Sequence, residues 1–246
     1  MRDWQGKTYW IVGASEGLGR ALAMTLSRVG CGLVVSARSS DRLDSLVAEL
    51  PGRARAVTID VNDPESVKKA AADVGEIDGL VYLAGTYDPM SATEWDTEKV
   101  VQMIETNVVG AVRTVGAVLP DMIAKDKGHI VLTGSLAGFR GMPGSIGYGS
   151  SKSAIMTLAE GMYIDLKGSN VEVQVVNPGF VKTRLTDKND FKMPQLMEPD
   201  DAAREYFEHM NSDEFKKSFP FAFGTAIRLG QLLPDWLYFP LFSRKS

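Results

Sequence analysis

Residues 8–19 read TYWIVGASEGLG, a short apolar run followed at once by three closely spaced glycines. The run is typical of a buried strand, and the apolar spacing over residues 18–29 predicts a helix directly behind it. Gly13 permits a tight turn, Gly17 lets the backbone approach a pyrophosphate, and Gly19 lets the helix pack close to the sheet. The helix N-terminus offers free N–H groups to anionic oxygens, so the stretch predicts a dinucleotide site, with a purely structural turn as the alternative.

The same alternation of short apolar runs and amphipathic stretches continues along the chain. Near-continuous apolar runs are typical of strands whose two faces are both covered, as in a parallel sheet. The pattern predicts a single α/β domain over residues 1–246, a Rossmann-type doubly wound parallel sheet with helices on both faces. The expected strands are 8–12, 32–36, 55–60, 79–84, 129–133 and 171–176, and the expected helices are 18–29, 41–50, 64–74, 96–123 and 148–166.

The composition is that of an ordinary globular protein, with 246 residues, 44% hydrophobic, 24% charged and a net charge of −4. This balance argues against a nucleic-acid partner. Cys31 is the single cysteine, which excludes an internal disulfide, and with His129 and His209 it is too few ligands for a common structural zinc site. We therefore expect no metal. The first residues carry no apolar leader and no apolar run reaches ~20 residues, so a cytoplasmic protein without a membrane span is expected.

The residues after the second expected strand indicate which dinucleotide is preferred. An NAD site places an acidic residue there to hold the ribose hydroxyls, but this chain has Ala37. Arg38 can pair with a 2′-phosphate, and Ser39 can donate a hydrogen bond to it. We therefore predict NADP(H) as the preferred cofactor, with NAD(H) as the second choice. A solvated Arg38 is the alternative, and the negative charge of Glu16 beside the phosphates is a signal against the preference.

A tyrosine and a lysine four residues apart open the last of the expected helices. This spacing puts Tyr148 and Lys152 on one helix face. A nearby ammonium group lowers the pKa of a phenol from its usual value of ~10, which would let Tyr148 exchange a proton near neutral pH. Ser135 follows the fifth strand and should reach the same rim of the sheet. Taken alone, the pair could equally be helix packing with a solvated lysine.

Together, these motifs resemble the short-chain dehydrogenase/reductase family, over a stretch from about Gln5 to Thr183. The resemblance implies an oxidoreductase that moves a hydride between a nicotinamide and a carbonyl or alcohol carbon of a small molecule. It implies that Tyr148 is the acid/base, that Ser135 orients the substrate oxygen, and that Lys152 holds the nicotinamide ribose and tunes Tyr148. Asn107 would support the lysine through a water and extend the proton relay.

The resemblance also implies which residues contact the cofactor. Asp60 and Val61 would touch the adenine, and the segment from Pro178 to Thr183 would hold the nicotinamide end. With the two residues assigned to the 2′-phosphate, the expected cofactor contacts are Gly13, Ser15, Gly17, Leu18, Gly19, Arg38, Ser39, Asp60, Val61, Ala84, Gly85, Asn107, Tyr148, Lys152, Pro178, Gly179, Val181 and Thr183.

Three departures from the family pattern affect these expectations. Val12 stands where a threonine is common, and residues 82–85 read YLAG where the family has Asn-Asn-Ala-Gly. The missing asparagines help tie strands together near the adenine, so contacts there are in doubt. No Val-Asp-Gly-Gly-like tail follows Phe215, which weakens any expectation of a tetramer. The helices 96–123 and 148–166 predict a homodimer by the same resemblance.

The remaining segments suggest the substrate and two alternative functions. Residues 182–199 are predicted to form a flap over an apolar substrate, with a plain surface loop as the alternative. Residues 215–246 form an aromatic-rich extension that could wall the pocket, cover a partner subunit or make a weak contact with a membrane surface. A membrane-peripheral interaction protein is an alternative function that rests on this extension alone. The other alternative is a catalytically silent dinucleotide-binding sensor, against which the intact Ser135, Tyr148 and Lys152 count.

Overall fold

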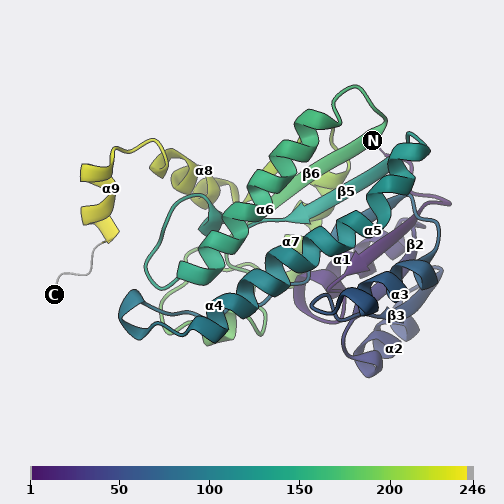
Figure 1. Cartoon of the computed structure of the whole chain (residues 1–246), viewed down its shortest axis with the longest axis horizontal. Helices are drawn as coiled ribbons and strands as arrows, with labels where there is room; N and C mark the ends of the chain where they lie inside the picture. The colour runs from purple at the N-terminus through teal and green to yellow at the C-terminus, as the bar shows by residue number, and fades with distance from the viewer. Residues whose placement is uncertain (1, 243–246) are drawn as a thin grey trace.

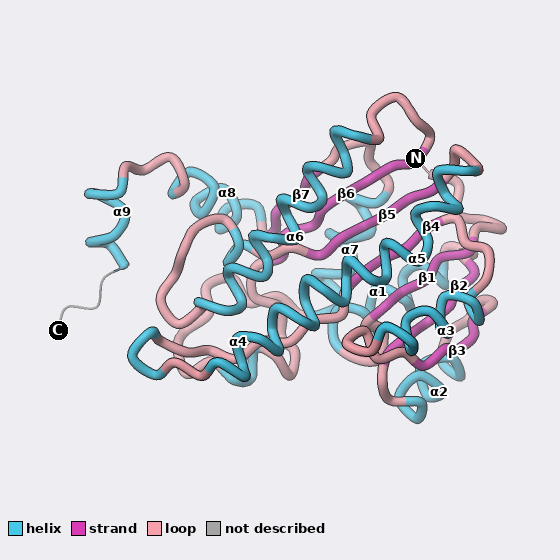
Figure 2. The backbone as a smooth tube through the Cα atoms, viewed as in Figure 1, coloured by secondary structure: helices cyan, strands magenta, loops and turns pink. Residues whose placement is uncertain are grey.

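A computed structural model describes residues 2–242, and within this range seven parallel strands form one sheet in the order β3-β2-β1-β4-β5-β6-β7 (Figures 1 and 2). Strand order reverses between β1 and β4, and ligands of such sheets bind where the order reverses, at the carboxyl ends of the strands. The strands are β1 (Thr8–Val12), β2 (Gly32–Ala37), β3 (Ala54–Thr58), β4 (Gly79–Tyr82), β5 (Gly128–Thr133), β6 (Val171–Pro178) and β7 (Lys216–Phe219).

Helices cover both faces of this sheet. They are α1 (Gly17–Arg28), α2 (Ser40–Glu49), α3 (Pro64–Val74), α4 (Thr97–Ile104), α5 (Gly110–Ala124), α6 (Ile146–Asp165), α7 (Pro199–Met210), α8 (Phe221–Gly230) and α9 (Asp235–Phe242). Side chains alternate between the two faces of a strand, so Tyr9 and Ile11 pack with α1, α2 and α7, whereas Trp10 and Val12 pack with α3, α5 and α6. Figure 1 shows α5 and α6 in front of the sheet and α7 behind it. The predicted doubly wound fold is confirmed.

The predicted single helix over 96–123 is wrong in one respect. A π-helical turn, Glu105–Val109, separates α4 from α5. Such a turn adds one residue to the helix, a change that apolar periodicity does not reveal. Taken through this turn, the helical run Thr97–Ala124 is long and apolar enough to cross a membrane. Core helices pass the same test, and Ala111, Val115 and Val118 of this run pack in the core.

The C-terminal quarter contains elements that the sequence pattern did not predict. Strand β7 pairs in parallel with β6, so a closing strand exists although the family's usual tail motif is missing. Helix α7 packs against α1 across the back of the sheet. Residues 182–198 form a loop with one 3₁₀ turn, Thr186–Lys188, and a bridge between Val181 and Met197 closes this loop at its base. Helices α8 and α9 then lead away from the sheet (Figure 1).

Candidate active site

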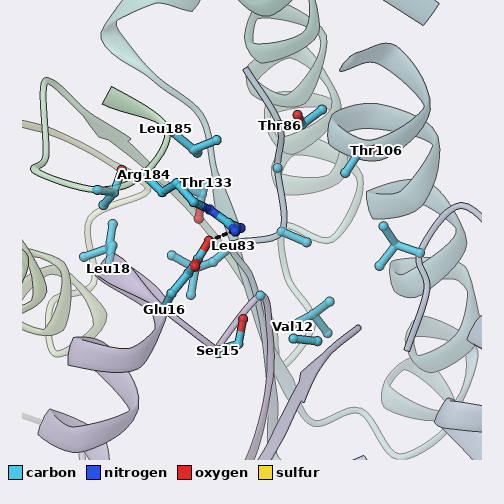
Figure 3. A pocket seen from close by; sticks show the side chains of 18 of the residues that line it. Val12, Ser15, Glu16, Leu18, Leu83, Thr86, Thr106, Thr133, Arg184 and Leu185 are labelled. Carbon is cyan, nitrogen blue, oxygen red and sulfur yellow. Dashed lines mark hydrogen bonds and ion pairs between the residues drawn. The ribbon is translucent and has the colours of Figure 1, made fainter. Parts of the chain in front are cut away.

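A cavity of about 710 Å³ lies at the carboxyl ends of the central strands. It runs from the glycine turn after β1 to the loop that follows β6, and Figure 3 shows side chains that line it. The predicted site residues that line this cavity are Gly13, Ser15, Gly17, Leu18, Gly19, Arg38, Ser39, Asp60, Val61, Ala84, Gly85, Ser135, Tyr148, Lys152, Pro178, Gly179, Val181 and Thr183. Residues from seven separate segments therefore meet at one place.

The glycine turn packs too closely against its own backbone neighbours to carry side chains at two positions. Gly13 has φ of +94°, and a Cβ there would lie 2.5 Å from the Ala84 nitrogen. A Cβ on Gly19 would lie 2.1 Å from the Gly13 oxygen, so only glycine fits at this point. Glu16 at the N-cap of α1 makes no capping hydrogen bond within the described residues. The first N–H groups of α1 therefore suit an anionic ligand such as a pyrophosphate.

Two arginines that the sequence analysis did not single out meet at Glu16. The Arg42 Nη1 atom lies 2.8 Å from one carboxylate oxygen, and the Arg184 Nη2 atom lies 2.6 Å from the other (Figure 3 draws the second pair). All three side chains are about half exposed, and ion pairs of this kind contribute at most about 1 kcal/mol. An anionic ligand could therefore replace Glu16 as the partner of these arginines. Arg42 lies one helical turn after Ser39, which is the only sequence signal that could have found it.

The strand end that lacks the family's asparagines is tied to its neighbours in another way. The Leu83 N–H donates to the Val12 oxygen over 2.8 Å. The Tyr82 hydroxyl donates to the backbone oxygen of Thr106 over 2.7 Å, which connects β4 to the π-helical turn. These two bonds hold residues 82–85 in place beside Gly13.

Ser135, Tyr148 and Lys152 meet at the inner part of the cavity. Ser135 lies two residues after β5, and its hydroxyl accepts a hydrogen bond from the Ala137 N–H. Lys152 is buried, donates to the Thr133 oxygen over 2.8 Å, and has its Nζ 5.7 Å from the centre of the Tyr148 ring. The ammonium group and the phenol are therefore neighbours one helical turn apart.

The expected lowering of the Tyr148 pKa by Lys152 is not what this structure gives. Burial raises the pKa of Tyr148 to about 12, although a hydrogen bond with Ser135 acts in the opposite direction. Burial also lowers the pKa of Lys152 to about 8. The common cause is burial, which penalises the charged form of each group. Tyr148 is therefore held as the neutral phenol, which is the form that donates a proton.

Asn107 does not line the cavity among the described residues. It is buried in the π-helical turn, where its amide bonds to both backbone groups of Thr86 and donates to the Ser151 hydroxyl over 2.9 Å. A Cβ on Gly85 would lie 3.2 Å from the Asn107 oxygen and 3.7 Å from the Lys152 nitrogen. Asn107 thus fastens the loop after β4 to α6 beside Lys152, and its direct contact with the cofactor stays a prediction.

Tyr87 is a further residue at the site that the sequence analysis missed. Its ring packs edge-on against Tyr148 with the ring centres 5.0 Å apart. The Tyr87 hydroxyl donates to the Asn189 side chain over 2.8 Å. The Lys188 ammonium group donates to the backbone oxygen of Tyr87 and to the Asp88 carboxylate. The loop after β4 therefore holds the 182–198 loop next to the catalytic candidate. No motif marks Tyr87, because its position depends on where these two loops meet.

Comparison with known proteins identifies the class that this fold and site define. The sequence profile of the short chain dehydrogenases matches residues 7–193. A Myxococcus xanthus protein described as an uncharacterized oxidoreductase is 36% identical over 247 residues, which cover 97% of each chain. A 3-oxoacyl-[acyl-carrier-protein] reductase of Thermotoga maritima is 33% identical over 75% of this chain and 78% of its own.

A solved structure extends the likeness to the fold of nearly the whole chain. A short chain dehydrogenase/reductase from Burkholderia phymatum, in complex with NAD, has a TM-score of 0.86 and 25% identity and covers 94% of this chain and 95% of its own. The chain belongs to the short-chain dehydrogenase/reductase family, which are oxidoreductases dependent on NAD or NADP.

Proposed function

We propose that this chain is an NADP(H)-preferring oxidoreductase that interconverts a carbonyl and an alcohol on an apolar small molecule. The observation that carries the proposal is the meeting of Ser135, a protonated Tyr148 and Lys152 inside a cavity that begins at a phosphate-binding turn. The glycine turn and the open N-terminus of α1 fit a dinucleotide, which would supply or accept the hydride when bound.

The three side chains divide the remaining work between them. Ser135 and Tyr148 would hydrogen-bond the substrate oxygen and place its carbon for hydride transfer. Tyr148 would then donate its proton to that oxygen as negative charge develops there. Lys152, with a pKa of about 8, is mostly charged at neutral pH and would stabilise the phenolate that remains. In the oxidising direction the same groups would act in reverse.

The preference for NADP(H) is supported by the cations at one end of the cavity. Arg38, Ser39 and Arg42 line it beyond the end of β2, and Ala37 occupies the strand-end position where an NAD site would place an acidic residue. Guanidinium groups suit a 2′-phosphate, since they make charge-assisted hydrogen bonds to two oxygens at once.

The apolar character of the substrate is supported by aromatic side chains on the segments that carry cavity residues. Phe180 lies two residues after the end of β6. Its ring centre is 5.8 Å from that of Phe191 and 5.8 Å from that of Phe223. Phe180 stands between Gly179 and Val181, which both line the cavity, and the Tyr87 ring packs on Tyr148 itself. Ligand sites of this composition favour apolar molecules.

The test combines cofactor binding with a ketone panel. Thermal shift with NADPH and NADH should show the larger stabilisation with NADPH, and NADPH absorbance should fall when an apolar ketone is added. Tyr148→Phe should keep the thermal shift and lose about 10²–10⁴-fold in turnover. Tyr163→Phe on the exposed side of α6 is the matched control and should keep full activity. Cofactor binding without turnover on any ketone would favour the silent-sensor alternative.

We also propose that the chain forms a homodimer. Helices α4, α5 and α6 carry large apolar side chains that are exposed to solvent, namely Val101, Val112, Ile123 and Ile164. Pairing of these helices with a second copy would remove them from water. Light scattering at micromolar concentration should report twice the monomer mass, and a monomer would exclude this assembly.

A further inference from the structure

The last two helices form an apolar projection that the oxidoreductase site does not require. We call residues 221–242, which hold α8 and α9, the C-terminal arm; Figure 1 shows α9 well away from the sheet. Three large apolar side chains of the arm are almost fully open, with Phe221 82%, Leu232 80% and Trp236 76% exposed. Leaving such side chains in water costs about 1.5–3 kcal/mol each relative to burial, so their exposure calls for an occupant.

The arm is held in a defined position by one arginine of the body. The Arg140 guanidinium donates to the backbone oxygens of Gly230 and Leu233, forms an ion pair with Asp235, and lies 3.8 Å from the centre of the Tyr238 ring. Tyr238 is buried, and its hydroxyl donates to the Gly141 oxygen. The arm therefore presents its apolar side chains from a fixed base, and the one acidic group of the arm is already neutralised.

The distribution of apolar side chains around α9 favours an apolar layer, rather than a flat protein surface, as the partner of the arm. Trp236 and Leu241 of α9 are both exposed although they lie about 140° apart around the helix. Leu237, between them, is also exposed. A protein partner would cover one face of a helix, whereas a helix that is apolar on most sides suits immersion in an apolar layer. A tryptophan at the tip suits the boundary layer of a bilayer, where its polar N–H can meet water.

The charges of this part of the chain indicate which bilayer it fits. From Phe219 to the end, the sequence has three basic residues (Arg228, Arg244, Lys245) and one acidic residue, Asp235, a net charge of +2 in a chain whose total is −4. Arg228 and Asp235 cancel within the arm, so the excess positive charge comes from Arg244 and Lys245, which lie outside the described residues. We propose that the C-terminal arm binds the surface of an anionic lipid bilayer, with its aromatic and aliphatic side chains in the interfacial layer.

The place of the arm in the fold puts this surface on the substrate side of the molecule. Phe223 of α8 stacks on Phe180, which is next to the loop that lines the cavity. Arg140, which holds the arm, lies on the connection between Ser135 and α6. A bound bilayer would thus lie on the side of the molecule that carries the catalytic candidates.

The test measures binding of the full chain to lipid vesicles. Co-sedimentation is compared between vesicles of phosphatidylcholine alone and vesicles with about one third phosphatidylglycerol. We expect the protein to bind the anionic vesicles, more weakly as salt is raised, and to bind the neutral vesicles less. Trp236→Ser should lower the partition coefficient about tenfold, because it removes one large interfacial side chain. Trp95→Ser is the matched control, since Trp95 is also exposed but lies far along the chain between β4 and α4.

Three results would overturn the proposal. The first is no binding of the full chain to either kind of vesicle. The second is an equal loss of binding in Trp95→Ser and Trp236→Ser. The third is a change of Trp236→Ser from dimer to monomer in light scattering without vesicles, because a second copy would then be the occupant of the arm. Retained stabilisation by NADPH shows that each variant is folded, so a loss of vesicle binding can be assigned to the arm.

Discussion

The contacts of Tyr87 allow its hydroxyl and its ring to be tested separately. Tyr87→Phe removes the hydroxyl that donates to Asn189 over 2.8 Å and keeps the ring beside Tyr148. A hydrogen bond between neutral groups contributes about 1 kcal/mol, which corresponds to about fivefold in a binding constant. Because Asn189 lies in the loop that packs next to the substrate space, we expect KM for an apolar ketone to rise about fivefold with kcat nearly unchanged.

Tyr87→Ala removes the ring as well. An aromatic pair contributes about 0.5–1.5 kcal/mol beyond the area it buries, and its loss also admits water to Tyr148. Since burial is the main cause that holds the Tyr148 pKa at about 12, this variant should move the pKa down toward ~10. We therefore expect kcat to fall about tenfold in addition to the rise in KM, because Tyr148 loses the wall that fixes its position.

Two measurements decide the matter. Steady-state kinetics with NADPH separates KM from kcat for both variants, and ultraviolet difference titration, with Tyr148→Phe as the blank, follows the ionisation of Tyr148. Tyr163→Phe, outside the cavity, is the control for loss of a tyrosine hydroxyl. Unchanged KM in Tyr87→Phe would refute the tether between the two loops. An unchanged Tyr148 titration in Tyr87→Ala would refute the shielding of the phenol by the ring.

Four further predictions follow from the geometry. Gly19→Ala places a Cβ 2.1 Å from the Gly13 oxygen, so it should abolish cofactor-induced stabilisation and lower Tm by several degrees in a melting scan. Arg42→Ala should raise KM for NADPH about tenfold and leave KM for NADH unchanged; equal effects on both would count against a 2′-phosphate contact. Reduction should slow as pH rises above about 8, where Lys152 loses its charge, and a flat rate profile to about pH 10 would contradict this. Burial lowers the His129 pKa to about 3, so the unfolded chain binds one more proton below pH ~6.5, and urea denaturation should show stability falling on acidification by at most about 1.4 kcal/mol per pH unit from this group.

The strands and the first helices of the fold could be predicted because their patterns are local. An apolar run such as Ile11 to Val12, followed by glycine, marks both a buried strand and its end. Strand β7 reads KKSF and has no such pattern. It is a strand because its backbone pairs with β6, which the sequence of β7 alone does not indicate. The extra residue of the π-helical turn was also out of reach, because helical spacing of apolar residues looks the same on either side of it.

The site was predictable where chain order places residues at strand ends, and not where loops meet. Gly13, Ser135 and Gly179 each follow a strand of one parallel sheet, so their common rim could be expected. Arg184 reaches the cavity, and Tyr87 reaches the Tyr148 ring, from loops whose paths depend on tertiary packing. The direction of the Tyr148 pKa shift was wrong for a related reason, since helical spacing predicts a neighbouring charge but not the degree of burial.

The π-helical turn that contains Asn107 lets the two halves of the long helix pack against different neighbours. An added residue rotates α4 by about 100° relative to a continuous α5, so that α4 packs on α6 while α5 packs on α3 and β5. Removal of one residue here would restore regular helical winding, yet it would swing α4 off its neighbour and take the Asn107 amide away from Thr86. The irregular turn is thus what allows one helical rod to serve two packing partners, and its length is as constrained as the identity of any side chain around the cavity.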